Sequence, residues 1–518
     1  MAVSTALYSL ATGLSRVIGL LREIIVAGLF GVAGGGINAF TVANQVPNLI
    51  RSLVADAALG AAFVPVFNEI LERDERERAW RVASSVWWIA FLGLSLITGV
   101  SMVLAPQILG LFGYEGSLGV GLARVIFPTV VILGLSGLAT SILNTFDEFF
   151  LPAIAPVAWN VVIVGALVLA IPFSSSETTR LYVYAVGILI GTVVQFALPL
   201  PAMRRHGRIA WTIDHRDPAV RRVFVMMFPV AIGLGLINLN LLVDTYFAAR
   251  LDQNLAPRSI EAAFRVYMLP QGMFSVAVAA VVFPVLSRHV ANRDGKAYRA
   301  TFASGIRQIA FLLIPASAVC AVFAFPITRL LFEHGNFSAD QTPVVARCLA
   351  AFAAGLTFNG IVLLLNRAFF SLQLPWLPTI ASVANLIVNA VLDWWLSRAL
   401  GIWGIPLATS IVNIVATVIL YRLLRSRTGP VDEYATLRSL VRISVAAAIA
   451  VAVGYPAWYA LDQLLGRALP LQVVSLGVGI GLAGVVYGLI ARATRIAEFD
   501  DVMAIVRRRG GRDDLQPD

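Results

Sequence analysis

The 518-residue sequence contains little charge and almost no cysteine. Asp, Glu, Lys and Arg together make up 13% of it, and only two cysteines are present. A soluble domain needs much more charge than this to cover its surface, so the composition excludes an ordinary soluble protein. Cys320 and Cys348 lie inside apolar segments and lack metal-ligand spacing, which excludes a disulfide framework and a zinc site.

Apolar residues make up 59% of the chain, and its mean hydropathy is +0.83. They form segments of about 20 residues, long enough for a helix to cross a hydrocarbon core of roughly 30 Å. We therefore predict an all-α polytopic membrane protein with fourteen transmembrane helices. The predicted spans lie near residues 2–30, 37–70, 82–105, 121–146, 151–171, 181–203, 222–250, 259–288, 301–325, 342–371, 376–398, 403–424, 438–461 and 469–491.

The formal net charge of +10 comes from arginines gathered in alternate loops. The loops near residues 73–81, 204–216 and 293–299 are rich in them, whereas those near 31–36 and 112–121 have almost none. By the positive-inside rule, this pattern predicts a multi-pass membrane protein with both termini in the cytoplasm. Because the arginines serve as topology signals, we predict no nucleic-acid partner.

Similar fragments recur at a nearly constant spacing. "PQILGLF" from Pro106 matches "PITRLLF" from Pro326, and "LNTFDEFFLPAIAP" from Leu143 matches "LNRAFFSLQLPWLP" from Leu365. Each copy holds six spans, an even number, so we predict two parallel six-helix repeats around a central cavity. The predicted domains are an N-lobe at 1–215, a C-lobe at 216–430, a C-terminal helix pair at 431–492 and a basic tail at 493–518.

Four arginines fall at bilayer depth, where a charge is costly and marks a functional site. They are Arg16, Arg22, Arg51 and Arg265. Guanidinium groups bind phosphate through paired hydrogen bonds, so these arginines predict a cationic cavity for an anionic headgroup. The structural alternative is that they pair with Asp56 or Glu23, or extend to the interface.

A second polar set consists of oxygen donors suited to a hard cation. Asn389 and Asp393 are four residues apart and share a helix face, while Thr409 and Asp393 each lie eight residues from Gly401 and so reach one depth. The predicted site comprises Asp244, Asn389, Asp393, Thr409 and the carbonyl of Ile405, and its occupant is sodium or a proton. The alternative is that the two aspartates are protonated or hydrogen-bonded locally and have a structural role.

Several segments closely resemble the MurJ (MviN) lipid II flippases of the multidrug/oligosaccharidyl-lipid/polysaccharide exporter superfamily. They are "SRVIGLLREIIVAGLFG" at 15–31, "VPNLIRSLVADAALGAAFVPVF" at 46–67, "LPQGMFSVAVAAVVFPVLSR" at 269–288 and "LFEHGNFSADQT" at 331–342. The resemblance implies a transporter of the bacterial inner membrane, not an enzyme. Such a protein moves lipid II, the undecaprenyl-pyrophosphate-linked peptidoglycan precursor, to the outer leaflet by alternating access.

The resemblance also assigns roles to residues. It places the family's essential cavity arginines on the four arginines above, the sodium site of relatives on the five oxygen-donor residues, and a lipid-tail groove on the last two helices. We expect a monomer that contacts membrane lipids and binds no cofactor beyond sodium. Asn38 stands where an aspartate is usual in the family and Met268 where some relatives carry an acidic residue, and both changes remove negative charge from the cavity.

Three other functions compete with lipid II transport. A flippase for another polyprenyl-linked glycan and a cation-coupled drug exporter fit the same fold, although four arginines disfavour a cationic drug. A polytopic glycosyltransferase would also bind lipid-linked sugars. It needs catalytic carboxylates in a sizeable loop, whereas the outer loops here are short and hold only isolated acids such as Glu115 and Asp252.

Overall fold

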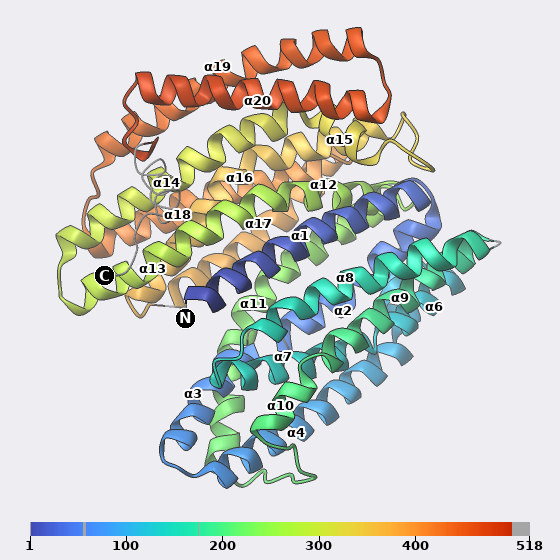
Figure 1. Cartoon of the computed structure of the whole chain (residues 1–518), viewed down its shortest axis with the longest axis vertical. Helices are drawn as coiled ribbons and strands as arrows, with labels where there is room; N and C mark the ends of the chain where they lie inside the picture. The colour runs from blue at the N-terminus through green and yellow to red at the C-terminus, as the bar shows by residue number, and fades with distance from the viewer. Residues whose placement is uncertain (1, 55–57, 175, 375, 500–518) are drawn as a thin grey trace, which may run out of the picture. The chain divides into compact units, whose positions relative to one another are not determined.

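A computed structural model describes residues 2–54, 58–174, 176–374 and 376–499, which form helices joined by short turns (Figure 1). Within them, side chains are not described for residues 2–12, 51–54, 58–59, 61, 229–230, 232–234 and 236–237. The chain divides into two compact units. The first comprises Met1–Ala262 and His334–Ser338, and the second comprises Ala263–Glu333 and Ala339–Asp518.

The first unit holds the helices of the N-terminal half and one long helix after them. They are α1 (Ala2–Phe30), α2 (Gly35–Val54), α3 (Ala58–Glu72), α4 (Arg76–Val103), α5 (Ala105–Leu111), α6 (Ser117–Ile126), α7 (Thr129–Thr145), α8 (Phe150–Ala170), η1 (Ile171–Phe173), α9 (Glu177–Ala197), α10 (Leu200–His206) and α11 (Pro218–Leu251). The next helix, α12 (Ala256–Pro270), begins in the first unit and ends in the second.

The second unit continues from α12 through a π-helical turn, η2 (Gln271–Ser275), which follows the helix-breaking Pro270. Its remaining helices are α13 (Val276–Ala291), α14 (Gly295–Val322), α15 (Ala324–Phe332), α16 (Thr342–Ser371), α17 (Trp376–Leu400), α18 (Gly404–Thr428), α19 (Glu433–Leu465) and α20 (Leu469–Ala493). The last two form a tightly packed hairpin.

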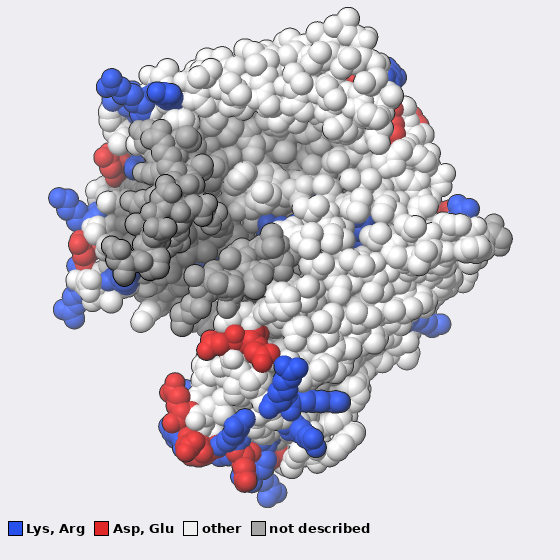
Figure 2. Space-filling view, viewed as in Figure 1, with Lys and Arg blue, Asp and Glu red and all other residues white. Residues whose placement is uncertain are grey.

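The helices agree with the spans predicted from hydropathy. Eleven helical stretches in the described ranges are long and apolar enough to cross a membrane. The other three predicted spans coincide with α1, with α2 and α3 together, and with α11. On the face shown in Figure 2, most charged side chains gather toward the ends of the helices, and the surface between them is largely uncharged apart from a few Lys or Arg atoms near the middle. The all-α, multi-pass class is thus confirmed, and the count of fourteen stays a prediction.

Matching parts of the two sequence copies form matching local structures. "PQILGLF" lies in the short helix α5 after α4, and "PITRLLF" lies in the short helix α15 after α14. Asp147 and Gln373, in the turns that precede α8 and α17, both have left-handed φ values, of 58° and 59°. Hydropathy alone did not predict α5 and α15, because each is too short to span a membrane.

An apolar cluster holds α1 against its neighbours in the first unit. Val26 of α1 packs with Phe40 of α2, Ile163 of α8 and Tyr184 of α9, and all four are buried. The rings of Phe40 and Tyr184 stack with centroids 4.4 Å apart. This packing fixes which side of α1 faces α2, α8 and α9.

The C-terminal end of α1 is capped by a segment more than 300 residues away. The Asn336 N–H donates to the Gly28 carbonyl at 2.7 Å, and its side-chain Nδ2 donates to the Leu29 carbonyl at 2.5 Å. These carbonyls belong to the last turn of the helix and lack intrahelical partners. Gly335, with φ +63°, lies so close to Gly28 that a side chain at 335 would collide with the Gly28 carbonyl.

Candidate functional site

Two of the predicted arginines, Arg16 and Arg22, lie on α1, a 29-residue helix with no internal proline. Arg16 is half-buried, whereas Arg22 is only 6% exposed. A guanidinium buried among apolar helices requires compensating partners, since an isolated buried charge is very costly. The surroundings of Arg22 therefore define the candidate site.

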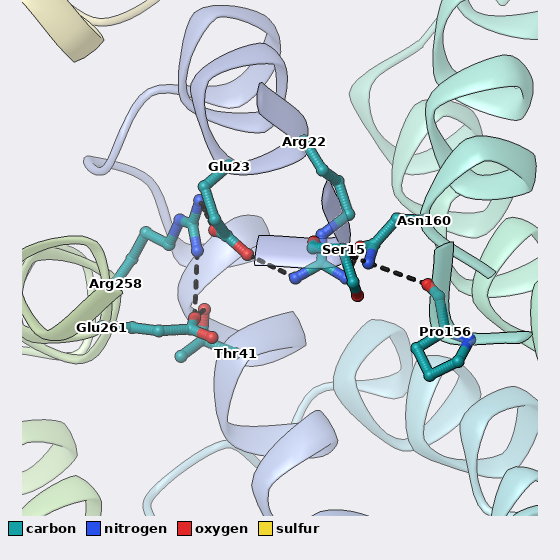
Figure 3. Close-up of polar contacts among 8 residues, drawn as sticks. All are labelled: Ser15, Arg22, Glu23, Thr41, Pro156, Asn160, Arg258 and Glu261. Atoms are coloured by element: carbon teal, nitrogen blue, oxygen red, sulfur yellow. Dashed lines mark hydrogen bonds and ion pairs between the residues drawn. The ribbon is translucent and has the colours of Figure 1, made fainter. Parts of the chain in front are cut away.

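Arg22 is held by three groups, of which Figure 3 shows Asn160 and Glu23. Its Nη1 donates to Asn160 Oδ1 at 3.1 Å, and its Nη2 donates to Glu23 Oε1 at 2.7 Å. Its guanidinium carbon lies 4.8 Å from the centroid of the Trp159 ring, in cation–π geometry. Only one of the three partners, Glu23, carries a negative charge. In this conformation Arg22 pairs with Glu23, which is the structural alternative given above for the predicted arginines.

Glu23 also bonds a second buried arginine from α12. Arg258 Nη2 donates to Glu23 Oε2 at 3.0 Å, and Arg258 Nη1 donates to Glu261 Oε2 at 3.0 Å. The Thr41 hydroxyl donates to the same Glu261 oxygen at 3.2 Å. We call Arg22, Glu23, Arg258 and Glu261 the charge cluster. Its two positive and two negative groups balance, which explains how Arg22, Glu23 and Arg258 can lie buried beside the partly buried Glu261.

Asn38 joins three backbone segments next to the charge cluster. Its Nδ2 donates to the carbonyls of Val32, Gly34 and Asn254 at 2.8–2.9 Å, and its Oδ1 accepts the Arg258 N–H at 2.8 Å. A carboxylate has no hydrogen to donate and would repel these carbonyls. The asparagine at position 38, where the resemblance implied an acidic residue, therefore suits this local structure, which the sequence did not indicate.

The other predicted arginines have different surroundings. Arg16 makes no ion pair or side-chain hydrogen bond within the described ranges. Arg51 lies on α2, but its side chain is outside the described residues. Arg265 lies on α12 in the second unit and is half-buried. Met268, one turn further along α12, is 41% exposed.

The predicted cation ligands fall in both units. Asp244 lies on α11 in the first unit and is 4% exposed. In the second unit, Asn389 and Asp393 are fully buried on one face of α17, and Asn389 Nδ2 donates to Asp393 Oδ2 at 2.9 Å. On α18, the Thr409 hydroxyl donates to the Ile405 carbonyl at 3.5 Å, a long hydrogen bond. The structure thus brings together Asn389 with Asp393, and Thr409 with Ile405.

Comparison with known proteins decides the family. The model of the family described as "Lipid II flippase MurJ" matches residues 26–476. The chain belongs to this family. The lipid II flippase MurJ of Burkholderia cenocepacia is 31% identical, over 90% of this chain and 92% of its own length. The probable lipid II flippase MurJ of Rhizobium meliloti is 30% identical, over 93% of this chain and 94% of its own length.

Solved structures support the same fold. A lipid II flippase MurJ in an inward closed conformation matches with a TM-score of 0.78 at 24% identity, covering 94% of this chain and 99% of its own. An inward-facing multidrug resistance MATE transporter matches with a TM-score of 0.71 at 16% identity, covering 80% and 94%. At these identities the likeness concerns the fold alone. The resemblance that the sequence motifs indicated is confirmed by the family match.

Several residues of this MurJ family member were missed from the sequence. Trp159 and Asn160 were overlooked inside the apolar span at 151–171, although a lone amide at bilayer depth is itself a signal. Arg258 and Glu261 lie at the boundary of a predicted span, where charges are usually solvated. Nothing local in the sequence shows that α12 brings them to Glu23.

The C-terminal hairpin, predicted to hold the lipid tail, contains charged groups of its own. Arg329 of α15 pairs through two nitrogens with the Asp462 carboxylate of α19, and its Nε donates to Gln472 Oε1 at 3.1 Å. Arg329 and Asp462 are each 6% exposed. At the other end of the hairpin, Arg307 Nε of α14 donates to Glu498 Oε1 at 2.6 Å. We call these two ion pairs the hairpin fastenings.

Glycines bring the two hairpin helices into direct contact. A side chain at Gly454 would collide with the Gly479 carbonyl, and one at Gly479 would meet the Trp458 side chain at 2.6 Å. Small residues allow this close backbone approach between membrane helices. The hairpin is therefore a tightly packed pair that is fixed to α14 and α15 near both of its ends.

Proposed function

We propose that the protein is a lipid II flippase that moves its substrate from the inner to the outer leaflet of the bacterial cytoplasmic membrane by alternating access. The observation that carries this proposal is the MurJ family match over residues 26–476, which spans both units. Moving a lipid across a membrane neither forms nor breaks a covalent bond. The protein is accordingly a transporter and not an enzyme.

The headgroup is bound by Arg16, Arg22, Arg51 and Arg265. Pyrophosphate offers several anionic oxygens, and guanidinium groups match them in charge and geometry. Arg16 supports this role because it has no ion pair in the described ranges. Arg22 shares the Glu23 carboxylate with Arg258 in the conformation described, and its Nε has no hydrogen-bond partner among the described residues, so it keeps a donor for the substrate.

The lipid tail lies along the C-terminal hairpin. A row of apolar residues spaced four apart on α19 is 41–61% exposed: Leu437, Val441, Val445, Ile449 and Val453. Successive residues at this spacing are neighbours on the helix surface, so the row forms a continuous apolar strip that winds along α19 and suits contact with an isoprenoid chain. The hairpin fastenings hold the helix that carries this row.

The architecture consists of fourteen spans in two parallel six-helix repeats, 1–215 and 216–430, with both termini in the cytoplasm. The matching short helices α5 and α15 and the matching left-handed turns support the repeat. The arginine-rich loops support the orientation. The transporter works as a monomer.

A sodium ion is bound by Asp244, Asn389, Asp393, Thr409 and the Ile405 carbonyl. Buried carboxylate, amide and hydroxyl oxygens suit a hard cation, and Asn389 and Asp393 already contact each other on α17. The ion would compensate the buried carboxylates and stabilise one conformation of the transporter. It can shift the conformational balance only through a difference in affinity between the two states.

Depletion of the protein in its host tests the main proposal. Lipid II should accumulate in the inner leaflet before the cells lyse, while total lipid II synthesis continues. The two leaflets can be distinguished by adding, from outside, an enzyme that cleaves accessible lipid II. If the outer-leaflet fraction stays normal while another polyprenyl-linked glycan accumulates, the substrate assignment is wrong.

A further inference from the structure

We infer that Asn160 and Trp159, adjacent on α8, form a neutral cradle that orients Arg22 for headgroup binding without cancelling its charge. Asn160 acts through Arg22 and is therefore a positioning residue. The inference rests on the proposed role of Arg22 in binding the headgroup. Figure 3 shows Asn160 reaching from α8 to the Arg22 guanidinium, on the side away from Arg258.

The amide of Asn160 is fixed in one orientation. Its Oδ1 accepts from Arg22 Nη1 at 3.1 Å, while its Nδ2 donates to the carbonyls of Pro156 at 3.1 Å and Ser15 at 3.5 Å. Turning the amide over would place two donors against each other and two acceptors against each other. Asn160 is 4% exposed, so water cannot replace these contacts.

The Trp159 ring is held just as firmly. Its Nε1 donates to the Thr192 hydroxyl on α9 at 3.2 Å, and Thr192 is fully buried. Gly191, next to it, leaves room for the indole, since a side chain there would approach Trp159 to 3.0 Å. The face of a fixed aromatic ring attracts a guanidinium while carrying no charge of its own.

The cradle carries no charge, so it positions Arg22 without neutralising the guanidinium. Among the described residues, the only anionic group bonded to Arg22 is Glu23, whose second oxygen accepts from Arg258. The Nε of Arg22 has no hydrogen-bond partner in the part of the chain that is described. Arg22 thus keeps both positive potential and an unused donor, which a phosphate oxygen needs. A carboxylate at position 160 would remove that potential by closing a second buried ion pair.

The test is a double-mutant cycle on the purified full-length protein. The variants are Asn160→Asp, Arg22→Ala and the pair combined. The probe is a short-chain, water-soluble lipid II analogue, and the measurement is its dissociation constant by calorimetry. We expect Asn160→Asp to weaken binding at least tenfold in the wild-type background and to have no further effect when Arg22 is alanine.

Asn68→Asp provides a matched control. It adds the same charge to α3, which packs against α4, α7 and α11, and it should leave the affinity unchanged. Asn160→Ala removes the acceptor without adding charge and should weaken binding about three- to fivefold. If Asn160→Asp does not fold, Asn160→Ala enters the same cycle, and an Arg22-dependent loss of affinity again supports the cradle.

Two results would overturn the inference. One is an unchanged affinity of the folded Asn160 variants for the analogue. The other is an equal loss in the wild-type and Arg22→Ala backgrounds, which would make Asn160 a structural residue only. If Arg22→Ala alone binds the analogue as tightly as wild type, the proposed role of Arg22 is itself wrong, and the cradle is rejected with it.

Discussion

The charge cluster and the hairpin fastenings both consist of buried or partly buried ion pairs, but they differ in how their charges are shared. In the charge cluster, Glu23 contacts two arginines and Arg258 contacts two glutamates, so each contact has an alternative. In the fastening at Arg329, one guanidinium and one carboxylate pair with each other, and both Nη atoms of Arg329 donate to Asp462. Shared charges can exchange a partner for a substrate, whereas a closed pair holds two helices together.

The comparison predicts the largest loss of stability at the closed pair. Asp462→Ala leaves Arg329 buried and without its carboxylate, which should cost about 3 to 5 kcal/mol. We expect this loss in denaturant unfolding of the detergent-purified protein. Combining Asp462→Ala with Arg329→Met should recover much of the stability, because no buried charge then remains. If the double variant is as unstable as Asp462→Ala alone, the loss of stability does not come from leaving Arg329 buried without its partner.

A smaller loss is expected within the charge cluster. Glu23→Gln removes the carboxylate that both arginines share and should cost roughly 2 to 3 kcal/mol. Glu261→Gln should cost about 1 kcal/mol, since Arg258 keeps its contact with Glu23. Equal losses in the two variants, measured by the same unfolding assay, would show that the charges are not shared in the way the hydrogen bonds indicate.

Sodium should have a moderate effect if the proposed cation site exists. A tenfold preference for the bound conformation is worth about 1.4 kcal/mol. Thermal unfolding should therefore shift upward in sodium relative to potassium at equal ionic strength, and Asp393→Ala should abolish the shift. Normal transport by Asp393→Asn, together with no sodium-specific shift in wild type, would assign the aspartate a structural role.

The smallest effect on stability is expected at Arg16, and it should accompany a large loss of function. Arg16→Ala breaks no ion pair within the described ranges, so the free energy of unfolding should change by less than about 0.5 kcal/mol. Lipid II transport should nevertheless be lost, with Arg16→Lys restoring only part of it. Normal complementation of a depleted host by Arg16→Ala would remove Arg16 from the headgroup site.

Most of the helical framework could be predicted from the sequence, because each membrane span must satisfy its own backbone and is apolar over a fixed length. The span predicted at 342–371 has the same bounds as α16. The partners of Arg22 were harder to predict. Glu23 is its neighbour in sequence, but Asn160 lies 138 residues away, and their contact depends on how α1 packs against α8.

The charge states of the site were also only partly predictable. The sequence shows which arginines lie at bilayer depth, but it does not distinguish the compensated Arg22 from Arg16 on the same helix. Arg258 and Glu261 lie near a predicted span end, where solvent is the ordinary partner. Arg258 is nevertheless buried and Glu261 partly buried, because of tertiary packing that hydropathy does not report.

The cap on the last turn of α1 has a consequence for how the protein can vary. Gly28, Gly335 and Asn336 are not among the residues proposed to bind substrate, yet they form the end of the helix that carries Arg16 and Arg22. A selection for growth should therefore tolerate few replacements at these three positions. A larger residue at position 335 would collide with the Gly28 carbonyl unless the end of α1 also changed. Substitutions at positions 335 and 28 would therefore have to occur together, although they are more than 300 residues apart.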